Sequence, residues 1–208
     1  MLLVVLTGGI GAGKSSVSEA MAARGAVIVD ADAIVKELQQ PDGAIHRAMV
    51  DRWGATIVAD DGGLDRQAVA DIVFNDADEL KALNEIVHPE TRAEMRRQAE
   101  ANAGTDRVVV LDLPLLGGRD DAAKRGASAI VVVDCPVEVA IQRLIEHRGF
   151  ERDDAEARIA NQVGRDERLG WADFVVDNGG DLDQLAGEID RCWTWLRTLE
   201  HGAALPER

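Results

Sequence analysis

The sequence contains only two cysteines and no apolar run long enough to cross a membrane. Cys135 and Cys192 share no spacing typical of metal or redox sites, so we expect two reduced thiols in the core. A membrane span needs about 20 apolar residues. The apolar run Leu2–Leu6 is short and has no basic flank, which predicts a buried strand rather than a signal peptide. Together these absences predict a cytoplasmic protein without a membrane partner.

Positive charge is also scarce, because 23 Lys and Arg stand against 38 Asp and Glu, for a net charge of −15. Such a surface repels nucleic acid and anionic lipid, so we expect neither as a partner. A polyanionic ligand would require basic side chains gathered locally. The 208 residues, 46% of them hydrophobic, are enough for one globular domain with a sizeable core.

One stretch near the N-terminus carries a specific motif. Residues 2–16 read LLVVLTGGIGAGKSS, and the pattern G-x-x-x-x-G-K-[ST] is met by Gly8, Gly13, Lys14 and Ser15. An apolar run precedes the motif and a helical pattern follows it. This context predicts a phosphate-binding loop between a strand and a helix, rather than a glycine-rich turn that only joins the two.

Each part of this loop has a chemical role in the prediction. The amides of Gly11–Ser15 point inward and form a cradle for phosphate oxygens. The helix that begins near Lys14 presents its free N–H groups and positive dipole end to the same phosphates. Lys14 reaches the β- and γ-phosphates, and the Ser15 hydroxyl ligates Mg²⁺.

Short apolar strands alternate with helical segments along the rest of the chain, which predicts an α/β fold with a parallel sheet. The expected strands are 2–6, 26–29, 107–111, 129–133 and 174–176. Between the second and third strands, residues 60–103 read as a run of short helices, including 77–87 and a separate helix 90–101 that begins after Pro89. This run is a candidate substrate-covering region.

Several strands end in an acid, and ligands of parallel sheets lie beyond the carboxyl ends of the strands. Asp112 follows four apolar residues, as expected of an acid that holds Mg²⁺ or its waters beside the phosphate loop. Asp30 and Asp32 follow the second strand, and one of them could accept the proton of an attacking hydroxyl. The alternatives are that Asp112 merely ends its strand and that Asp32 is only the N-cap of the next helix.

Two basic groups are candidates for anion contacts. Arg143, Arg148 and Arg152 span a helix end and a glycine-marked loop, where an arginine-rich lid would stabilise charge on a transferring phosphoryl group. The alternative is a solvated helix with salt bridges. His88 precedes Pro89 and is close in sequence to Arg92, which belongs to a basic helical face. This face contacts either an anionic substrate or only water.

These motifs, in this order, resemble the dephospho-coenzyme A kinase family over nearly the whole chain. The segments that carry the resemblance are LTGGIGAGKS at 6–15, VDADAI at 29–34, LNEIVHPETR at 83–92, LDLPLL at 111–116, QRLIEHRG at 142–149, ARIANQ at 157–162 and ADFVVDNGG at 172–180. The resemblance implies a P-loop NTPase fold with a five-stranded parallel sheet flanked by helices. It implies a single domain over 1–208, with a helical CoA-covering region at about 60–103 and a lid at about 143–158.

The resemblance also implies a reaction, namely Mg²⁺-assisted transfer of the ATP γ-phosphate to the ribose 3′-hydroxyl of dephospho-CoA, in a monomer or small homo-oligomer. It makes Asp32 the base on that hydroxyl, with Lys14 and Arg143 as the other catalytic residues. The implied ATP-binding residues are Gly11, Ala12, Gly13, Lys14, Ser15, Ser16, Arg148 and Asn178, the last near the adenine. The implied substrate-binding residues are Asp32, His88, Arg92, Asp112 and Leu115, and Ser15 and Asp112 are the candidate Mg²⁺ ligands.

The chain departs from the family pattern at two places. It has Gly117-Gly118 where an aromatic and an acid usually follow PLL, and Arg148-Gly149-Phe150 where the lid often reads R-D-G. The main alternative function is a small P-loop kinase acting on a nucleoside monophosphate or a small alcohol. A nucleotide-dependent binding switch is a second alternative, although no N-K-x-D guanine-reading motif occurs in the sequence.

Overall fold

The computed structural model describes residues 1–202 and divides the chain into two compact units. The first, here called the sheet unit, comprises Met1–Val29 and the chain from Ala99 onward. The second, the helical unit, is Asp30–Gln98 and so begins well before the helical region expected at about residue 60. The single domain over 1–208, with its covering region and lid, stays a prediction, and residues 203–208 lie outside the described part.

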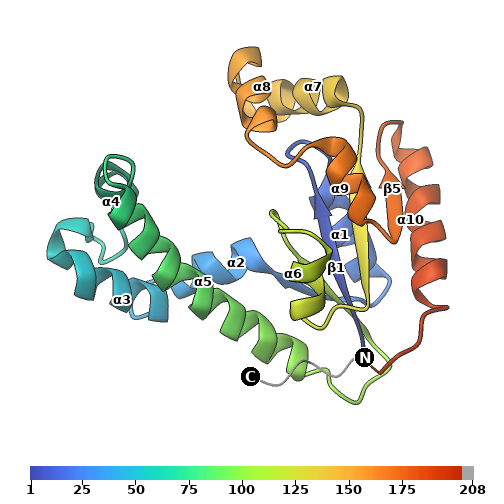
Figure 1. The fold of residues 1–208 in the computed structure, drawn as a ribbon, viewed down its shortest axis with the longest axis horizontal. Helices are drawn as coiled ribbons and strands as arrows, with labels where there is room; N and C mark the ends of the chain where they lie inside the picture. Colours follow the sequence, from blue (N-terminus) through green and yellow to red (C-terminus); the bar gives the residue numbers. More distant parts are fainter. Residues whose placement is uncertain (203–208) are drawn as a thin grey trace. The chain divides into compact units, whose positions relative to one another are not determined.

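The sheet has five strands in the order β2-β3-β1-β4-β5, which confirms the α/β fold that the alternation predicts (Figure 1). β1 pairs in parallel with β3 and β4, and β4 pairs in parallel with β5. All residues of β1, β3 and β4 are buried, as expected of strands covered on both faces. The strand bounds are Leu2–Gly8, Val27–Asp30, Val108–Asp112, Ala129–Asp134 and Phe174–Asp177.

The helices of the sheet unit bury their apolar residues against these strands. Val17 and Met21 of α1 and Leu185 and Ile189 of α10 join the strand side chains in one core. The sequence from Asp153 to about Leu169 has the pattern of one helix, but it forms two in the structure. The backbone is extended at Gly164, and a new helix begins after that residue. The helix bounds are α1 Lys14–Ala23, α6 Arg119–Lys124, α7 Val137–Arg148, α8 Arg152–Ala160, α9 Arg165–Trp171 and α10 Leu182–Leu196.

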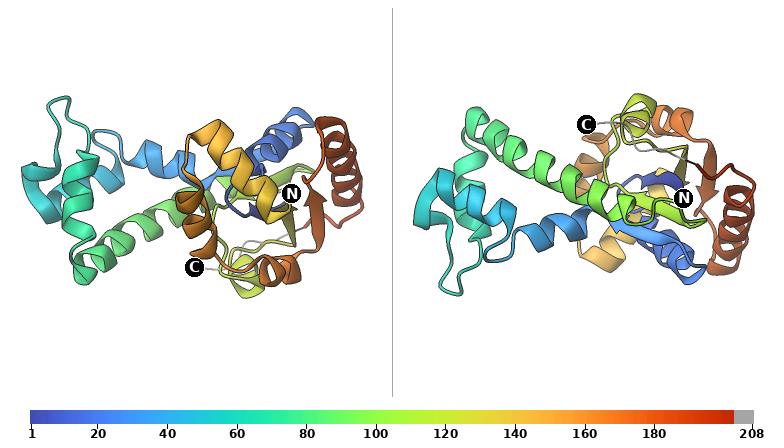
Figure 2. Two further views of the ribbon diagram at one scale, coloured as in Figure 1. Left: turned by 90° about the horizontal axis from the view of Figure 1, so that it is seen from above. Right: turned by 90° about the horizontal axis from the view of Figure 1, so that it is seen from below.

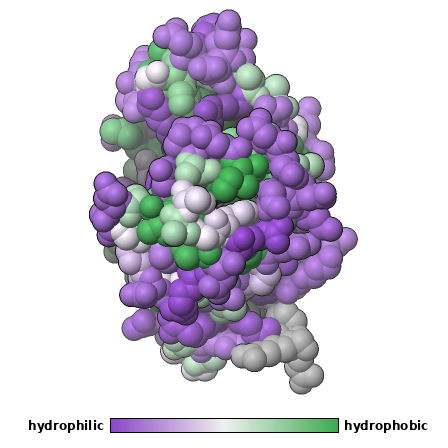
Figure 3. Space-filling model, turned by 90° about the vertical axis from the view of Figure 1, so that its left-hand side faces the viewer, coloured by the Kyte–Doolittle hydropathy of each residue, from purple (hydrophilic) through white to green (hydrophobic). Residues whose placement is uncertain are grey.

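The helical unit has its own small core, centred on Ile45, Met49 and Ile57. Its elements are α2 Ala31–Leu38, α3 Ala44–Trp53, the 3₁₀ turn η1 Gly54–Ile57, α4 Arg66–Val73 and the long α5 Ala77–Glu100, which is well seen in Figure 2. The view onto α3 and α4 is mostly hydrophilic with apolar side chains gathered near its middle (Figure 3). Phe74, which directly follows α4, is 80% exposed.

The predicted helix boundary at Pro89 is wrong, since α5 runs through it without a break. Proline lacks an N–H, so one hydrogen bond of the helix is lost at this position. Leu83, Ile86 and Val87 pack on the core of the helical unit just before the proline. Good helix formers continue on its far side, and the helical state therefore outweighs the single missing bond.

Within residues 1–202, no helix combines the length and the apolar character needed to traverse a bilayer. Both cysteines are free and buried, as the sequence predicts. Burial raises the pKa of the Cys192 thiol to about 12 and also raises that of Cys135. Both side chains are therefore neutral thiols of the core at neutral pH.

Candidate nucleotide site

The phosphate loop joins β1 to α1, in the strand–loop–helix context that the motif predicts. Gly11 and Gly13 have φ angles of 78° and 85°, in the left-handed region that glycine adopts without steric cost. A Cβ on Gly11 would also lie 2.7 Å from the Ala140 carbonyl oxygen. The backbone of the loop at Gly11 therefore lies in close contact with α7 near Ala140, and the loop continues directly into the first turn of α1.

Lys14 and Asp112 are brought together by the parallel pairing of β1 with β3. The ammonium group of Lys14 forms an ion pair with Oδ1 of Asp112, whose side chain is only 4% exposed. The lysine side chain is 19% exposed, so it retains access to the mouth of the loop. In this arrangement the Asp112 carboxylate is paired with the Lys14 ammonium, the group that the sequence predicts will contact the nucleotide phosphates.

Asn178 is hydrogen-bonded to the phosphate loop, and Arg143 is hydrogen-bonded to Asn178. The Asn178 side chain is buried, and its amide donates to the Ala12 carbonyl at 2.8 Å. Arg143 in turn donates to Oδ1 of Asn178 at 3.4 Å, and its buried Nη1 has no hydrogen-bond partner within residues 1–202. This guanidinium is thus positioned beside the loop with a donor unused. Asn178 is engaged with the loop itself, and its predicted place near the adenine remains a prediction.

The other two arginines of the predicted lid have different environments. Arg148 is exposed and ends α7, where Gly149 follows with a φ of 66°. Arg152 is held in ion pairs with Glu138 at 2.5 Å and Glu156 at 3.2 Å. These carboxylates raise the pKa of its guanidinium, and Arg152 therefore follows the salt-bridge alternative.

Three residues that sequence reasoning did not select also line this part of the sheet unit: Gln162, Arg165 and Arg168. Arg165 forms a two-pronged ion pair with the buried Asp134 at the end of β4, with distances of 2.6 and 3.0 Å. Gln162 accepts a hydrogen bond from the Ile10 amide of the loop at 2.9 Å. The segment ARIANQ, which contributes to the family resemblance, ends at Gln162, but the resemblance assigned no role to this residue.

In the helical unit, the structure separates the roles of the two acids that follow β2. Asp30 is the N-cap of α2, because its carboxylate accepts from the Ala33 amide at 3.0 Å. Asp32 lies in the first turn of α2 with an exposed side chain. The alternative in which Asp32 serves only as the cap is therefore wrong, and its carboxylate is available for another partner.

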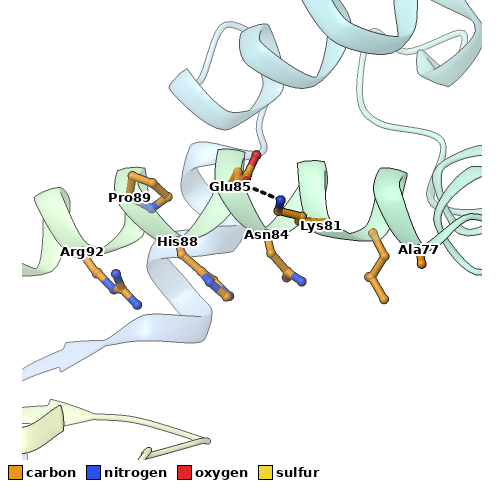
Figure 4. Close-up of a pocket in the computed structure, with 8 residues that line it drawn as sticks. Ala77, Lys81, Asn84, Glu85, His88, Pro89 and Arg92 are labelled. Carbon is orange, nitrogen blue, oxygen red and sulfur yellow. Dashed lines mark ion pairs between the residues drawn. The ribbon is translucent and has the colours of Figure 1, made fainter. Parts of the chain in front are cut away.

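His88 and Arg92 lie one helical turn apart on α5 and line a groove of about 430 Å³. Figure 4 shows Asn84, His88 and Arg92 projecting from the same side of the helix. Lys81 and Glu85, also in the lining, pair with each other at 3.8 Å. The groove thus presents a cation, an imidazole and an amide along one face, a set suited to an anionic and hydrogen-bonding ligand.

Leu115 and the two glycines after it lie in the loop between β3 and α6. Leu115 is 69% exposed, which is unusual for a leucine and leaves its side chain free to meet a ligand. Gly118 has a φ of 105° and packs against the indole of Trp171, 3.7 Å from the place a Cβ would occupy. Gly118 therefore has a role in the local fold, because its positive φ favours glycine.

No cluster of three or more His, Cys, Asp or Glu side chains suited to a metal occurs within residues 1–202. Ser15, by contrast, is exposed in the first turn of α1, and Asp112 lies beside its neighbour Lys14. A hydroxyl and a carboxylate fit an ion such as Mg²⁺, which keeps several waters and takes further oxygens from phosphates.

Comparison with known proteins identifies the family to which the chain belongs. Residues 2–184 match the family model described as dephospho-CoA kinase. A dephospho-CoA kinase of Streptomyces avermitilis is 42% identical over 201 residues, covering 97% of both chains. The crystal structure of TT1252 from Thermus thermophilus superposes with a TM-score of 0.76 at 27% identity, covering 94% of this chain and 97% of that one.

A dephospho-CoA kinase from Campylobacter jejuni has the same fold, with a TM-score of 0.68 at 22% identity, covering 94% of this chain and 96% of that one. These superpositions agree with the five-stranded sheet described above. The family model covers the loop, the Lys14–Asp112 pair and the α5 groove in one continuous match. By this match and by its identity to the Streptomyces protein, the chain belongs to the dephospho-CoA kinase family.

Proposed function

We propose that this protein phosphorylates the ribose 3′-hydroxyl of dephospho-CoA with ATP, giving coenzyme A in the last step of its biosynthesis. The observation that carries the proposal is the match of residues 2–184 to the dephospho-CoA kinases. The phosphate loop of the sheet unit supports it, because the loop has the glycine conformations and the lysine that a nucleoside triphosphate requires.

On the donor side, we assign the ATP phosphates to the loop amides from Gly11 to Ser16 and to Lys14. The Lys14 ammonium exchanges its ion pair with Asp112 for the β- and γ-phosphates when ATP binds. Arg143 stabilises the charge that develops on the transferring phosphoryl group, for which its unused buried donor is suited. Arg148 completes the donor site from the exposed end of α7.

On the acceptor side, Asp32 takes the proton of the 3′-hydroxyl as that oxygen attacks the γ-phosphate. The exposed carboxylate, free of the capping role, supports this assignment. His88 and Arg92 bind anionic parts of dephospho-CoA along α5, and Leu115 offers an apolar contact. The excess of acid over base makes such local cations important, because the rest of the surface repels a polyanion.

The proposal includes Mg²⁺ bound by Ser15, with Asp112 holding it directly or through water. When bound, the ion neutralises charge on the phosphate oxygens and holds them in position. Lys14 and Ser15 are adjacent at the start of α1, so one turn of helix presents both to the phosphates. We further propose a cytoplasmic enzyme that is a monomer or a small homo-oligomer.

The direct test combines the purified protein with ATP, Mg²⁺ and dephospho-CoA and follows the product by mass spectrometry. We expect dephospho-CoA to gain one phosphate, and chelation of Mg²⁺ with EDTA to stop the reaction. Parallel assays offer nucleoside monophosphates and small alcohols as acceptors. If one of these acceptors is phosphorylated and dephospho-CoA is not, the proposed function is wrong and the protein is a small P-loop kinase with another acceptor.

The acceptor site has a separate test in Arg92. Arg92→Ala is expected to raise the KM for dephospho-CoA about tenfold, the size of one charge-assisted hydrogen bond, with little change in the KM for ATP. Arg66→Ala is the matched control, because Arg66 is also an exposed helical arginine of the helical unit but lies outside the groove. Steady-state kinetics with each substrate varied in turn measures both effects. An unchanged KM for dephospho-CoA in Arg92→Ala would remove the α5 groove from the acceptor site.

A further inference from the structure

Arg168 of α9 lies against the first turn of the phosphate loop, where the proposed function needs positive charge. The position that a Cβ on Gly9 would take is 2.8 Å from Nη2 of Arg168. We propose that Arg168 is a further nucleotide-binding residue, which donates to the phosphates of ATP across Gly9. The inference rests on the proposed function only in that the loop binds a nucleoside triphosphate.

The donors of Arg168 are only partly used by the protein. Nη1 donates to the Val163 carbonyl at 3.0 Å, which fixes the guanidinium plane. Nε is buried and has no hydrogen-bond partner within residues 1–202. A buried donor without a partner destabilises the fold, and more so when the group is charged. A bound anion would accept hydrogen bonds from the Arg168 guanidinium. This would explain why a guanidinium with an unused donor is buried beside an anion-binding loop.

The carboxylate that acts on Arg168 electrostatically, that of Asp134, is already paired with another arginine. Asp134 is engaged by Arg165, which donates to both of its carboxylate oxygens. Burial lowers the pKa of the Arg168 guanidinium, the Asp134 carboxylate raises it, and the positive charge of Arg165 lowers it further. An arginine remains protonated at neutral pH despite such a shift, so the site keeps its positive charge.

The geometry around Arg168 is fixed by the connection between α8 and α9. Gln162, at the start of this connection, binds the Ile10 amide, and Ile10 packs with Ile141, Leu144 and Ala155 of α7 and α8. A cavity of about 170 Å³ lies between the loop and the connection, and Arg168 lines it together with Gly9 and Gln162. The arginine is therefore held next to the loop by the fold and has space in front of it for a polar group.

The test measures binding of ATP and of tripolyphosphate to the full chain by titration calorimetry. Tripolyphosphate carries only the phosphates, so it reports on the loop without adenine or acceptor. We expect Arg168→Ala to weaken both ligands about 10- to 100-fold, as loss of a hydrogen bond to a charged group predicts. Arg168→Lys recovers part of the loss because it keeps the charge but not the planar fork. Arg191→Ala, which removes an exposed arginine of α10, is the matched control and leaves both affinities unchanged.

A second variant separates contact with the ligand from a merely structural role. In Gly9→Ala the new methyl group displaces the Arg168 guanidinium, so tripolyphosphate binding is expected to weaken. In the Arg168→Ala background the same change is expected to have no further effect, which a double-mutant cycle detects. Thermal melting confirms that each variant is folded.

Two outcomes would overturn the proposal. The first is wild-type affinity of Arg168→Ala for tripolyphosphate, and the second is full additivity of the Gly9 and Arg168 changes. Neither depends on the identity of the acceptor. A failure to form coenzyme A would contradict the proposed function and leave this binding test intact.

Discussion

Asp32→Asn is expected to lower kcat about 10²- to 10⁴-fold, the contribution of a general base, while ATP binding is retained. An asparagine keeps the size of the side chain and its hydrogen-bonding capacity, but it cannot accept the proton of the 3′-hydroxyl at neutral pH. The loss should therefore appear in kcat with dephospho-CoA and not in the dissociation constant of ATP. Steady-state kinetics and calorimetric titration with ATP measure the two quantities.

Asp30 provides the matched control for this variant. It is two residues from Asp32, and its carboxylate caps α2 by accepting from the Ala33 amide. Asparagine is as good an N-cap as aspartate, so Asp30→Asn is expected to keep both the melting temperature and the turnover. Near wild-type turnover in Asp32→Asn would show that Asp32 is not the base. Equal loss in both variants would instead point to a general need for negative charge at the start of α2.

The features that the sequence predicted well are those encoded by neighbouring residues. The loop from Gly8 to Ser15 and the five strands follow from a continuous motif and from apolar runs, and the structure has them where expected. The family was also accessible, because its motifs are local and keep their order along the chain. The fold and the position of the phosphate loop could therefore be predicted from sequence.

The features that were missed depend on contacts between residues far apart in the sequence, or on the end of a strand or helix lying one residue away from its predicted position. Arg165 and Arg168 become recognisable only when α9 packs beside β4 and the loop, which are far away in sequence. The division of roles between Asp30 and Asp32 depends on β2 ending one residue later than predicted. The continuous α5 required that packing outweigh the local preference of Pro89, which no local rule reports.

Lys14→Met is expected to lower kcat about 10²- to 10³-fold, because it removes a charged donor aimed at the β- and γ-phosphates. It should also destabilise the fold, since it leaves the carboxylate of Asp112, only 4% exposed, without its ion-pair partner. A buried charged acceptor without a partner costs on the order of 1–3 kcal/mol or more. Loss of activity in this single variant is therefore ambiguous unless stability is measured beside it by thermal or urea unfolding.

The double variant Lys14→Met, Asp112→Asn resolves this ambiguity. Replacing the carboxylate with an amide removes the buried charge, so the double variant is expected to regain most of the stability lost in Lys14→Met. Its turnover should remain low, because the phosphates still lack their lysine and the proposed Mg²⁺ site lacks its carboxylate. Recovery of turnover together with stability would mean that Lys14 serves the fold through Asp112 and not the transfer of phosphate. Because the ion pair joins the first residue of α1 to the last residue of β3, the paired change measures what this contact contributes to the fold.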